Sequence, residues 1–140
     1  MKGLGVVGIV ALGLVLAVGL GLLGWWFWSR TPPQGESPAA VDARAEQVAQ
    51  GRRLYEQNCA SCHQQGGIGP ELTALVLSNY RTADRLFRYV SRAMPYNAPG
   101  SLDEQTYWDI LAFLLAENGM LPEGVVLGPE TAPQVELKRK

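Results

Sequence analysis

Histidine and cysteine are scarce in this 140-residue chain, which has one histidine and two cysteines. A structural zinc site normally takes four cysteine or histidine ligands, and three such residues do not supply them. A second histidine, which could act as an acid or base beside a bound group, is missing. Because Cys59, Cys62 and His63 lie within five consecutive residues, the chain concentrates this chemistry in one short segment.

An excess of charge of either sign is also missing. The chain has 12 basic and 13 acidic residues and a formal net charge of −1. Such a balance produces no overall field that would attract nucleic acid or an acidic membrane surface. We therefore expect no nucleic-acid partner, and we expect any electrostatic recognition to be local.

Charged residues are absent from residues 3–28. At a rise of 1.5 Å per residue, a helix of this length extends about 39 Å, which exceeds the roughly 30 Å hydrocarbon core of a bilayer. Lys2 precedes the run and the aromatic residues 25–28 close it, as suits the two membrane interfaces. Residues 1–30 are therefore predicted to form one transmembrane anchor that leaves the rest of the chain on the extracytoplasmic side of the cytoplasmic membrane.

A cleaved signal peptide is the alternative for this segment. The apolar part of a signal peptide is typically only about 7–15 residues long, with a small-x-small cleavage site directly after it. Here the sequence Ser-Arg-Thr-Pro follows at residues 29–32 instead. This pattern favours an anchor that is not cleaved.

Proline and small polar residues dominate residues 31–40, which predicts an extended linker of about 30 Å. Periodic apolar residues then predict helices that make the domain at residues 41–127 all-α, followed by a tail at 128–140. The predicted helices run from Asp42 to about Asn58, from about Arg81 to Ala93, and from a capping box at Ser101–Glu104 to Asn118-Gly119. The first is expected to bury a loose apolar face made of Ala45, Val48, Ala49 and Tyr55.

The segment Cys59-Ala-Ser-Cys62-His63 has the spacing of a c-type haem attachment site. Two thiols at this spacing can each add to one vinyl group of haem, while the adjacent imidazole reaches the iron. A thioredoxin-like dithiol is read in a βαβ context, which is not predicted here. A disulfide between the two cysteines would close too short a loop to stabilise the chain much. The prediction is one haem c, bound covalently through Cys59 and Cys62, with His63 as an axial ligand.

The domain resembles the class I cytochrome c family. The matching pieces, in the family's order, are Gly51–His63, Ile68–Leu72, Met94-Pro95 and Tyr107–Leu114. The resemblance implies a small all-α cytochrome c fold around one covalent haem, with the Met94 thioether as sixth ligand and the Pro70 carbonyl accepting the other ring N–H of His63. It also implies that Gly51 and Tyr55 contact Ile110 and Phe113. Residues 101–134 are more loosely similar to cytochrome domains that accompany extracytoplasmic quinoprotein dehydrogenases.

With His63 and Met94 both bound, the iron would have no open site for a substrate, so the chain is predicted to carry single electrons and not to be an enzyme. Its expected partners are a dehydrogenase, a quinol-oxidising complex or a terminal oxidase. A fixed cytochrome subunit of a membrane-associated dehydrogenase or oxidase complex is the main alternative. A haem peroxidase or gas sensor would require Met94 to be absent from the iron or displaceable.

Four arginines, at positions 81, 85, 88 and 92, recur at helical spacing and share one face of the predicted middle helix. Leu86, Phe87 and Val90 lie on the opposite face, as in an ordinary amphipathic helix with a solvated side. The alternative is that the arginines steer an acidic redox partner toward the haem. Both interpretations remain open at the level of sequence.

Overall fold

The computed structural model describes residues 38–138. The predicted anchor at residues 1–30 and most of the predicted linker lie outside the described residues. Within 38–138, no helix combines the length and the apolar composition needed to cross a bilayer.

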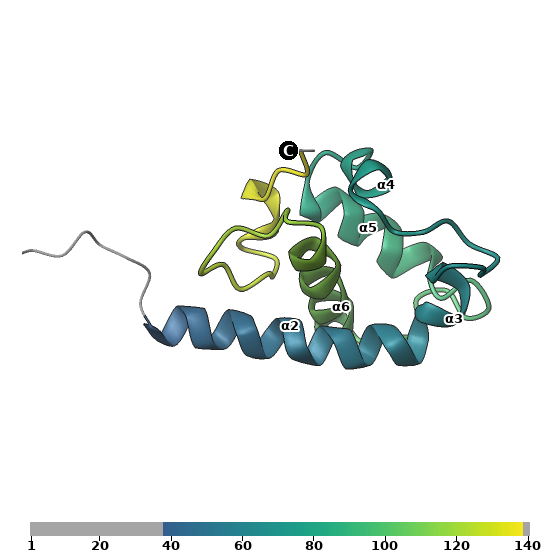
Figure 1. The fold of residues 1–140 in the computed structure, drawn as a ribbon, viewed down its shortest axis with the longest axis horizontal. Coiled ribbons are helices and arrows are strands. Elements are labelled where there is room, and N and C mark those ends of the chain that lie inside the picture. The colour runs from purple at the N-terminus through teal and green to yellow at the C-terminus, as the bar shows by residue number, and fades with distance from the viewer. Residues whose placement is uncertain (1–37, 139–140) are drawn as a thin grey trace, which may run out of the picture. The chain divides into compact units, whose positions relative to one another are not determined.

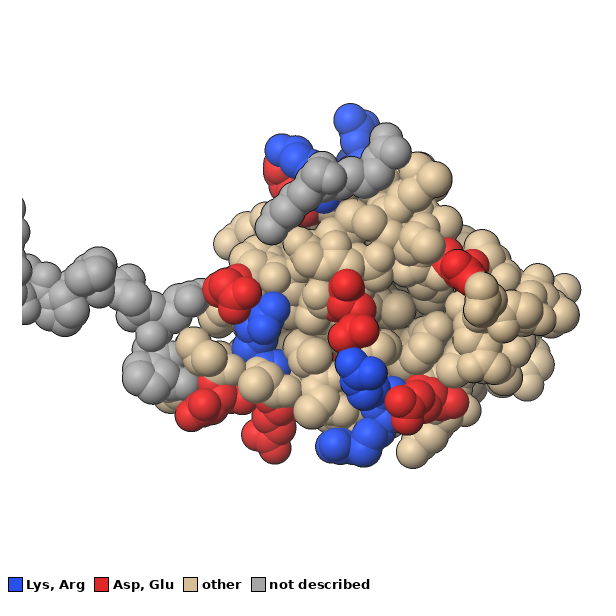
Figure 2. Space-filling view, in the orientation of Figure 1, with Lys and Arg blue, Asp and Glu red and all other residues tan. Residues whose placement is uncertain are grey.

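The described part of the chain is helical and contains no strand, as predicted (Figure 1). In chain order the elements are α2 Pro38–Asn58, α3 Ala60–His63, α4 Ala74–Ser78, α5 Ala83–Ala93, α6 Glu104–Glu117 and the 3-10 turn η1 Ala132–Gln134. The long helix α2 packs across α6, which is buried on nearly all sides, and α5 packs against α6 as well. Along the face over α2, acidic and basic side chains alternate without a large patch of one sign (Figure 2).

The first helix begins at Pro38, inside the segment predicted as linker, and not at Asp42. Proline suits the first turn of a helix, because its missing N–H would have no partner there and its φ angle is already helical. The predicted apolar face is half right. Ala45 and Ala49 are exposed, whereas Val48 packs against the core.

The crossing of α2 and α6 depends on Gly51. A Cβ atom at this position would lie 1.8 Å from the carbonyl oxygen of Asp109 and 2.9 Å from Cβ of Phe113. One turn further along α2, the rings of Tyr55 and Phe113 pack with their centroids 5.4 Å apart. The expected contact of Gly51 and Tyr55 with α6 is confirmed, and its tightest point is the backbone of Asp109.

A buried glutamine links α2 to two other parts of the chain. The Gln47 side-chain amide donates to Asp109 Oδ1 at 3.2 Å and to the Leu127 carbonyl at 2.8 Å, and its oxygen accepts from the Leu127 amide at 2.7 Å. Gln105 Nε2 donates to the same Asp109 oxygen at 2.7 Å. A buried amide has to find such partners, so this network fixes α2 against α6 and the segment after it.

Helix α6 begins after Asp103, not after Ser101 as the capping box suggested. The Asp103 carboxylate accepts from the Thr106 amide at 2.9 Å and from the Thr106 hydroxyl. These hydrogen bonds, first the one from the hydroxyl, lower the pKa of Asp103. The helix ends at Asn118-Gly119 as predicted, since Gly119 takes the left-handed conformation, with φ +65°.

Helix α5 begins at Ala83, two residues later than predicted. Thr82 is the N-cap and accepts from the Arg85 amide, while Arg81 adopts a positive φ of 69° outside the helix. The arginine face of the helix therefore consists of Arg85, Arg88 and Arg92. Arg88 forms an ion pair with Asp84 one turn earlier.

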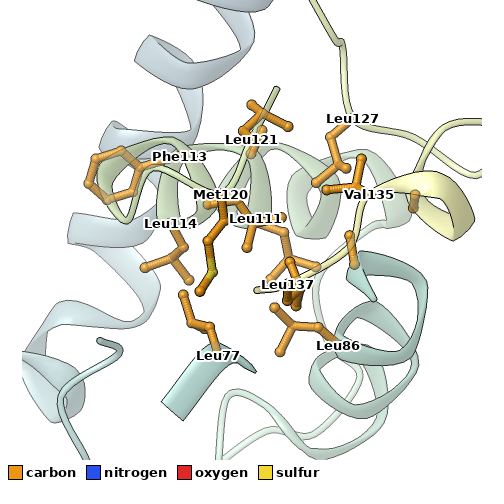
Figure 3. Close-up of a cluster of buried hydrophobic side chains, with 14 of the residues drawn as sticks. Leu77, Leu86, Leu111, Phe113, Leu114, Met120, Leu121, Leu127, Val135 and Leu137 are labelled. Carbon is orange, nitrogen blue, oxygen red and sulfur yellow. The ribbon is translucent and has the colours of Figure 1, made fainter. Parts of the chain in front are cut away.

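The segment at 128–140 was predicted to be a tail, but its described part belongs to the core. Val135 and Leu137 are 3% and 2% exposed and pack near Leu86 and Leu127 (Figure 3). The Val135 carbonyl accepts from the Ala83 amide at 3.0 Å, and the Leu137 amide donates to the Arg81 carbonyl at 2.9 Å. The domain therefore extends through at least residue 138.

Candidate cofactor site

A cavity of about 600 Å³ lies among α3, α4, α5, α6 and the loops between them. The structure brings all five predicted site residues to its wall, namely Cys59, Cys62, His63, Pro70 and Met94. The first and last of these are separated by 35 positions in the sequence. Residues from the two halves of the domain thus meet around one space.

The cavity wall is mostly apolar. Side chains from α4, α5 and α6 supply much of it: Val76, Leu77, Leu86, Val90, Ile110, Leu111 and Leu114. Among the described residues that line the cavity, none is Asp, Glu, Lys or Arg. A wall of this kind and a volume within the usual range of ligand sites suit a bulky apolar cofactor.

The two cysteines are placed by the end of α2 and by the single turn α3. The Cys59 amide continues the α2 hydrogen bonding, donating to the Tyr55 carbonyl at 2.8 Å, and the His63 amide donates to the Cys59 carbonyl at 3.0 Å. Both thiols are free. Burial, with a smaller contribution from Cys62, raises the pKa of Cys59 to about 11, so this thiol stays protonated at neutral pH.

The His63 ring is held by the glycine-rich loop that follows it. Nδ1 of His63 lies 2.8 Å from the carbonyl oxygen of Pro70. A Cβ atom on Gly69 would lie 2.9 Å from Cε1 of the ring, so only glycine lets the loop approach this closely. Donation from Nδ1–H to the carbonyl fixes the tautomer in which Nε2 is free to bind a metal.

Met94 is the C-cap residue of α5, and its amide donates to the Val90 carbonyl at 3.0 Å. Its own carbonyl accepts from the Tyr107 hydroxyl at 2.7 Å and from the Gly100 amide at 3.2 Å. Met120, in contrast, is 6% exposed and packs in the leucine-rich core (Figure 3). Of these two described methionines, Met94 is therefore the one that lines the cavity.

The sequence analysis did not identify Tyr107 as a residue that supports the site. In the sequence it stood out as the first residue of the segment Tyr107–Leu114 that carries the family resemblance, and its ring is buried. Nothing in its spacing indicates that its hydroxyl reaches the backbone of Met94, 13 positions earlier.

The residues around the cavity fit a haem. Two thiols, an imidazole with one nitrogen free and a thioether are the donors that a covalently attached, six-coordinate haem requires. They lie on a wall without Asp, Glu, Lys or Arg side chains, and the loop leaves room for the imidazole because Gly69 lacks a Cβ atom.

Comparison with known proteins agrees with this geometry. Residues 46–114 match the family described as Cytochrome C oxidase, cbb3-type, subunit III. The chain therefore carries a cytochrome c domain, which implies haem c. Such a domain is an electron-transfer unit and not the catalytic domain of an enzyme.

The similar curated proteins include three named Photosystem II extrinsic protein V. The one from Pyropia yezoensis is 31% identical over 84 residues, covering 54% of this chain and 52% of the relative. Those from Trichormus variabilis and a Nostoc species are each 29% identical over the same length and shares. The chain thus spans about half the length of the curated relatives it matches. No solved structure matches the chain.

Proposed function

We propose that this chain is a single-electron carrier of the class I cytochrome c type, in which Cys59 and Cys62 hold one haem covalently and His63 and Met94 bind its iron. The observation that carries the proposal is the convergence of these four side chains on one largely apolar cavity of about 600 Å³. A bound haem supplies reversible one-electron chemistry at its iron. The residues of the chain bind the haem, orient the imidazole and exclude water.

Each of these residues has a distinct task in the proposal. Pro70 orients the imidazole through the 2.8 Å contact between its carbonyl and Nδ1 of His63, which makes Nε2 a better donor. Met94 supplies a neutral thioether, which favours the reduced state relative to a second histidine. The apolar wall excludes water and so disfavours the added charge of the oxidised state. A haem held by both His63 and Met94 would have no position left on its iron for a substrate.

We further propose that residues 1–30 anchor the chain in the cytoplasmic membrane and that the haem domain works on the extracytoplasmic side. The support is the uncharged run at 3–28, the aromatic residues at its end and the proline-rich stretch that follows. A quinoprotein dehydrogenase is one donor that the looser resemblance of residues 101–134 suggests.

A matched pair of methionine variants tests the ligand assignment. Met94→Ala should keep the covalent haem in a pyridine haemochrome assay, but it should lose the methionine–iron charge-transfer band of the oxidised protein and have a lower potential. Met120→Ala, the control, should keep the band and lose about 2–5 kcal/mol of unfolding free energy, because it opens a cavity in the core. The opposite result for the two variants would exclude Met94 as the ligand.

The reduced wild-type protein should also fail to bind carbon monoxide at neutral pH. A peroxidase or gas sensor has an open or displaceable sixth position and would bind it readily. A strong carbon monoxide difference spectrum would therefore contradict the electron-carrier proposal.

A fixed subunit of a larger complex is the second candidate function. The family description names an oxidase subunit, and the names of the relatives describe an extrinsic protein of photosystem II. In this alternative the chain would pass electrons within one dehydrogenase, quinol-oxidising or oxidase complex instead of moving between two. Purification of the full chain from its membrane in mild detergent distinguishes the two, since a subunit should co-purify with partners in fixed proportion.

A further inference from the structure

The side chain of Tyr107 joins the segment that carries Met94 to the central helix α6. Its hydroxyl donates to the Met94 carbonyl at 2.7 Å, and the Leu102 amide points to the same hydroxyl oxygen at 3.5 Å. The first contact is a strong hydrogen bond by its length and the second a weak one. One hydroxyl thus contacts both ends of the loop between α5 and α6.

The loop itself has few other attachments. Within the described chain, the backbone hydrogen bonds of residues 95–101 are local: the Ala98 amide donates to Pro95, the Gly100 amide to Met94 and the Ser101 amide to Ala98. Tyr96, at the centre of this loop, is 82% exposed. These local turns do not join the loop to α6, so the hydroxyl of Tyr107 is its side-chain hydrogen-bond link to that helix, beside the packing of Leu102 against the core.

The ring of Tyr107 is itself held firmly. It is 3% exposed and meets Phe87 of α5 edge-to-face, with centroids 6.3 Å apart. Phe87 in turn stacks on Trp108 at 3.7 Å between centroids. Aromatic pairs of this geometry add to the stability of the core, so the hydroxyl is presented from a rigid base.

We infer that Tyr107 is a positioning residue for the axial thioether, holding Met94 at the cavity so that other ligands do not displace it. The inference rests on the proposed ligand role of Met94. An external ligand enters the sixth position only when Met94 has left it. The apparent affinity for such a ligand therefore follows the fraction of molecules in which the Met94 segment has opened.

The test is an imidazole titration of the oxidised, haem-containing full chain. Tyr107→Phe keeps the ring and removes only the hydroxyl, and the loss of one such hydrogen bond should tighten the apparent imidazole affinity about threefold to tenfold. The covalent haem should be unchanged in a pyridine haemochrome assay.

Tyr55→Phe is the matched control. Tyr55 packs on Phe113 of α6 and does not line the cavity, and no hydrogen bond links its hydroxyl to the Met94 segment in the described structure. Its imidazole affinity should equal that of the wild type. Phe87→Leu is a second variant, which leaves the Tyr107 hydroxyl in place and weakens its aromatic support, and a smaller increase in the same direction is expected.

A purely structural role would lower the unfolding free energy of Tyr107→Phe without changing its imidazole affinity, and that result would overturn the inference. If Tyr107→Phe did not fold, an unchanged imidazole affinity in Phe87→Leu would also overturn the inference. Failure of the proposed function has a different signature, because the wild-type protein would then already lack the methionine–iron band. In that case its imidazole affinity would match that of Met94→Ala.

Discussion

Gly51 is the position at which a single missing side chain determines how two helices meet. The 1.8 Å approach that a Cβ atom would make to the Asp109 carbonyl involves backbone, which cannot rotate away. Helices α2 and α6 would have to separate instead.

We therefore expect Gly51→Ala to lower the unfolding free energy by about 2 kcal/mol or more, because overpacking at the crossing exceeds the gain in helix propensity of about 1 kcal/mol. Urea unfolding of the haem-containing protein measures this. Gly128→Ala is the control, since nothing lies within 4 Å of a Cβ atom there, and it should change stability by less than about 0.5 kcal/mol. Equal effects in both variants would show that the crossing tolerates a methyl group.

Single residues also show which features of a fold its sequence does not predict. Cys59, Cys62 and His63 were predicted as haem-attachment residues because that chemistry depends on short spacing. Gln47 was not identified, although it is buried, because its partner Leu127 lies 80 positions away. A glutamine in a largely polar helix gives no sign of its burial until the fold supplies its partners.

At the scale of elements, the segment after α6 differs most from the sequence-based prediction. Its apolar residues are separated by glycine, proline and glutamate, and they show no helical period. Only the pairing of Val135 and Leu137 with the start of α5 makes this segment part of the core.

Leu137→Ala should accordingly cost about 2–5 kcal/mol of unfolding free energy, as expected for a buried leucine that leaves a cavity. Lys138→Ala removes the next side chain, which is exposed and forms only a surface ion pair with Glu136. It should change the stability by less than about 1 kcal/mol. The urea unfolding midpoints of the two variants show whether this segment stabilises the domain. Similar small decreases in both variants would mean that the segment is a tail that contributes little stability.

The arginines of α5 show how an element boundary changes an interpretation. Arg81 leaves the predicted face because the helix starts at Ala83, and the Asp84 carboxylate partly balances the charge of Arg88. The remaining exposed positions, Arg85 and Arg92, fit an ordinary solvated face at least as well as a steering surface.

At the scale of the whole molecule, the cavity makes folding depend on its occupant. Without an occupant, the apolar side chains that line this cavity of about 600 Å³ would lack packing partners and contact water, which removes burial that a domain of this size needs for its stability.

We therefore expect the double variant Cys59→Ser, Cys62→Ser, prepared without haem, to lose its near-ultraviolet circular dichroism and its cooperative unfolding transition. Serine has the shape of cysteine, with a smaller and more polar group in place of the thiol, and it prevents covalent attachment, so the variant mainly tests the cofactor. A cooperative transition with a native-like near-ultraviolet spectrum would contradict a fold built around haem.

The sequence alone predicted the helical class of the domain and the segment Cys59–His63, because both depend on spacing within a few turns of chain, whereas Pro70 and Met94 were predicted from the resemblance to a known family. Helix starts were less predictable. Asp103 and Ser101 are both good caps, and only the geometry of the preceding loop selects one of them. The tertiary structure decided what lies far apart in sequence: the Gln47 network, the packing of Val135 and Leu137, and the hydroxyl of Tyr107 on Met94. No local sequence pattern predicts these contacts, because they join residues that come together only when the chain folds.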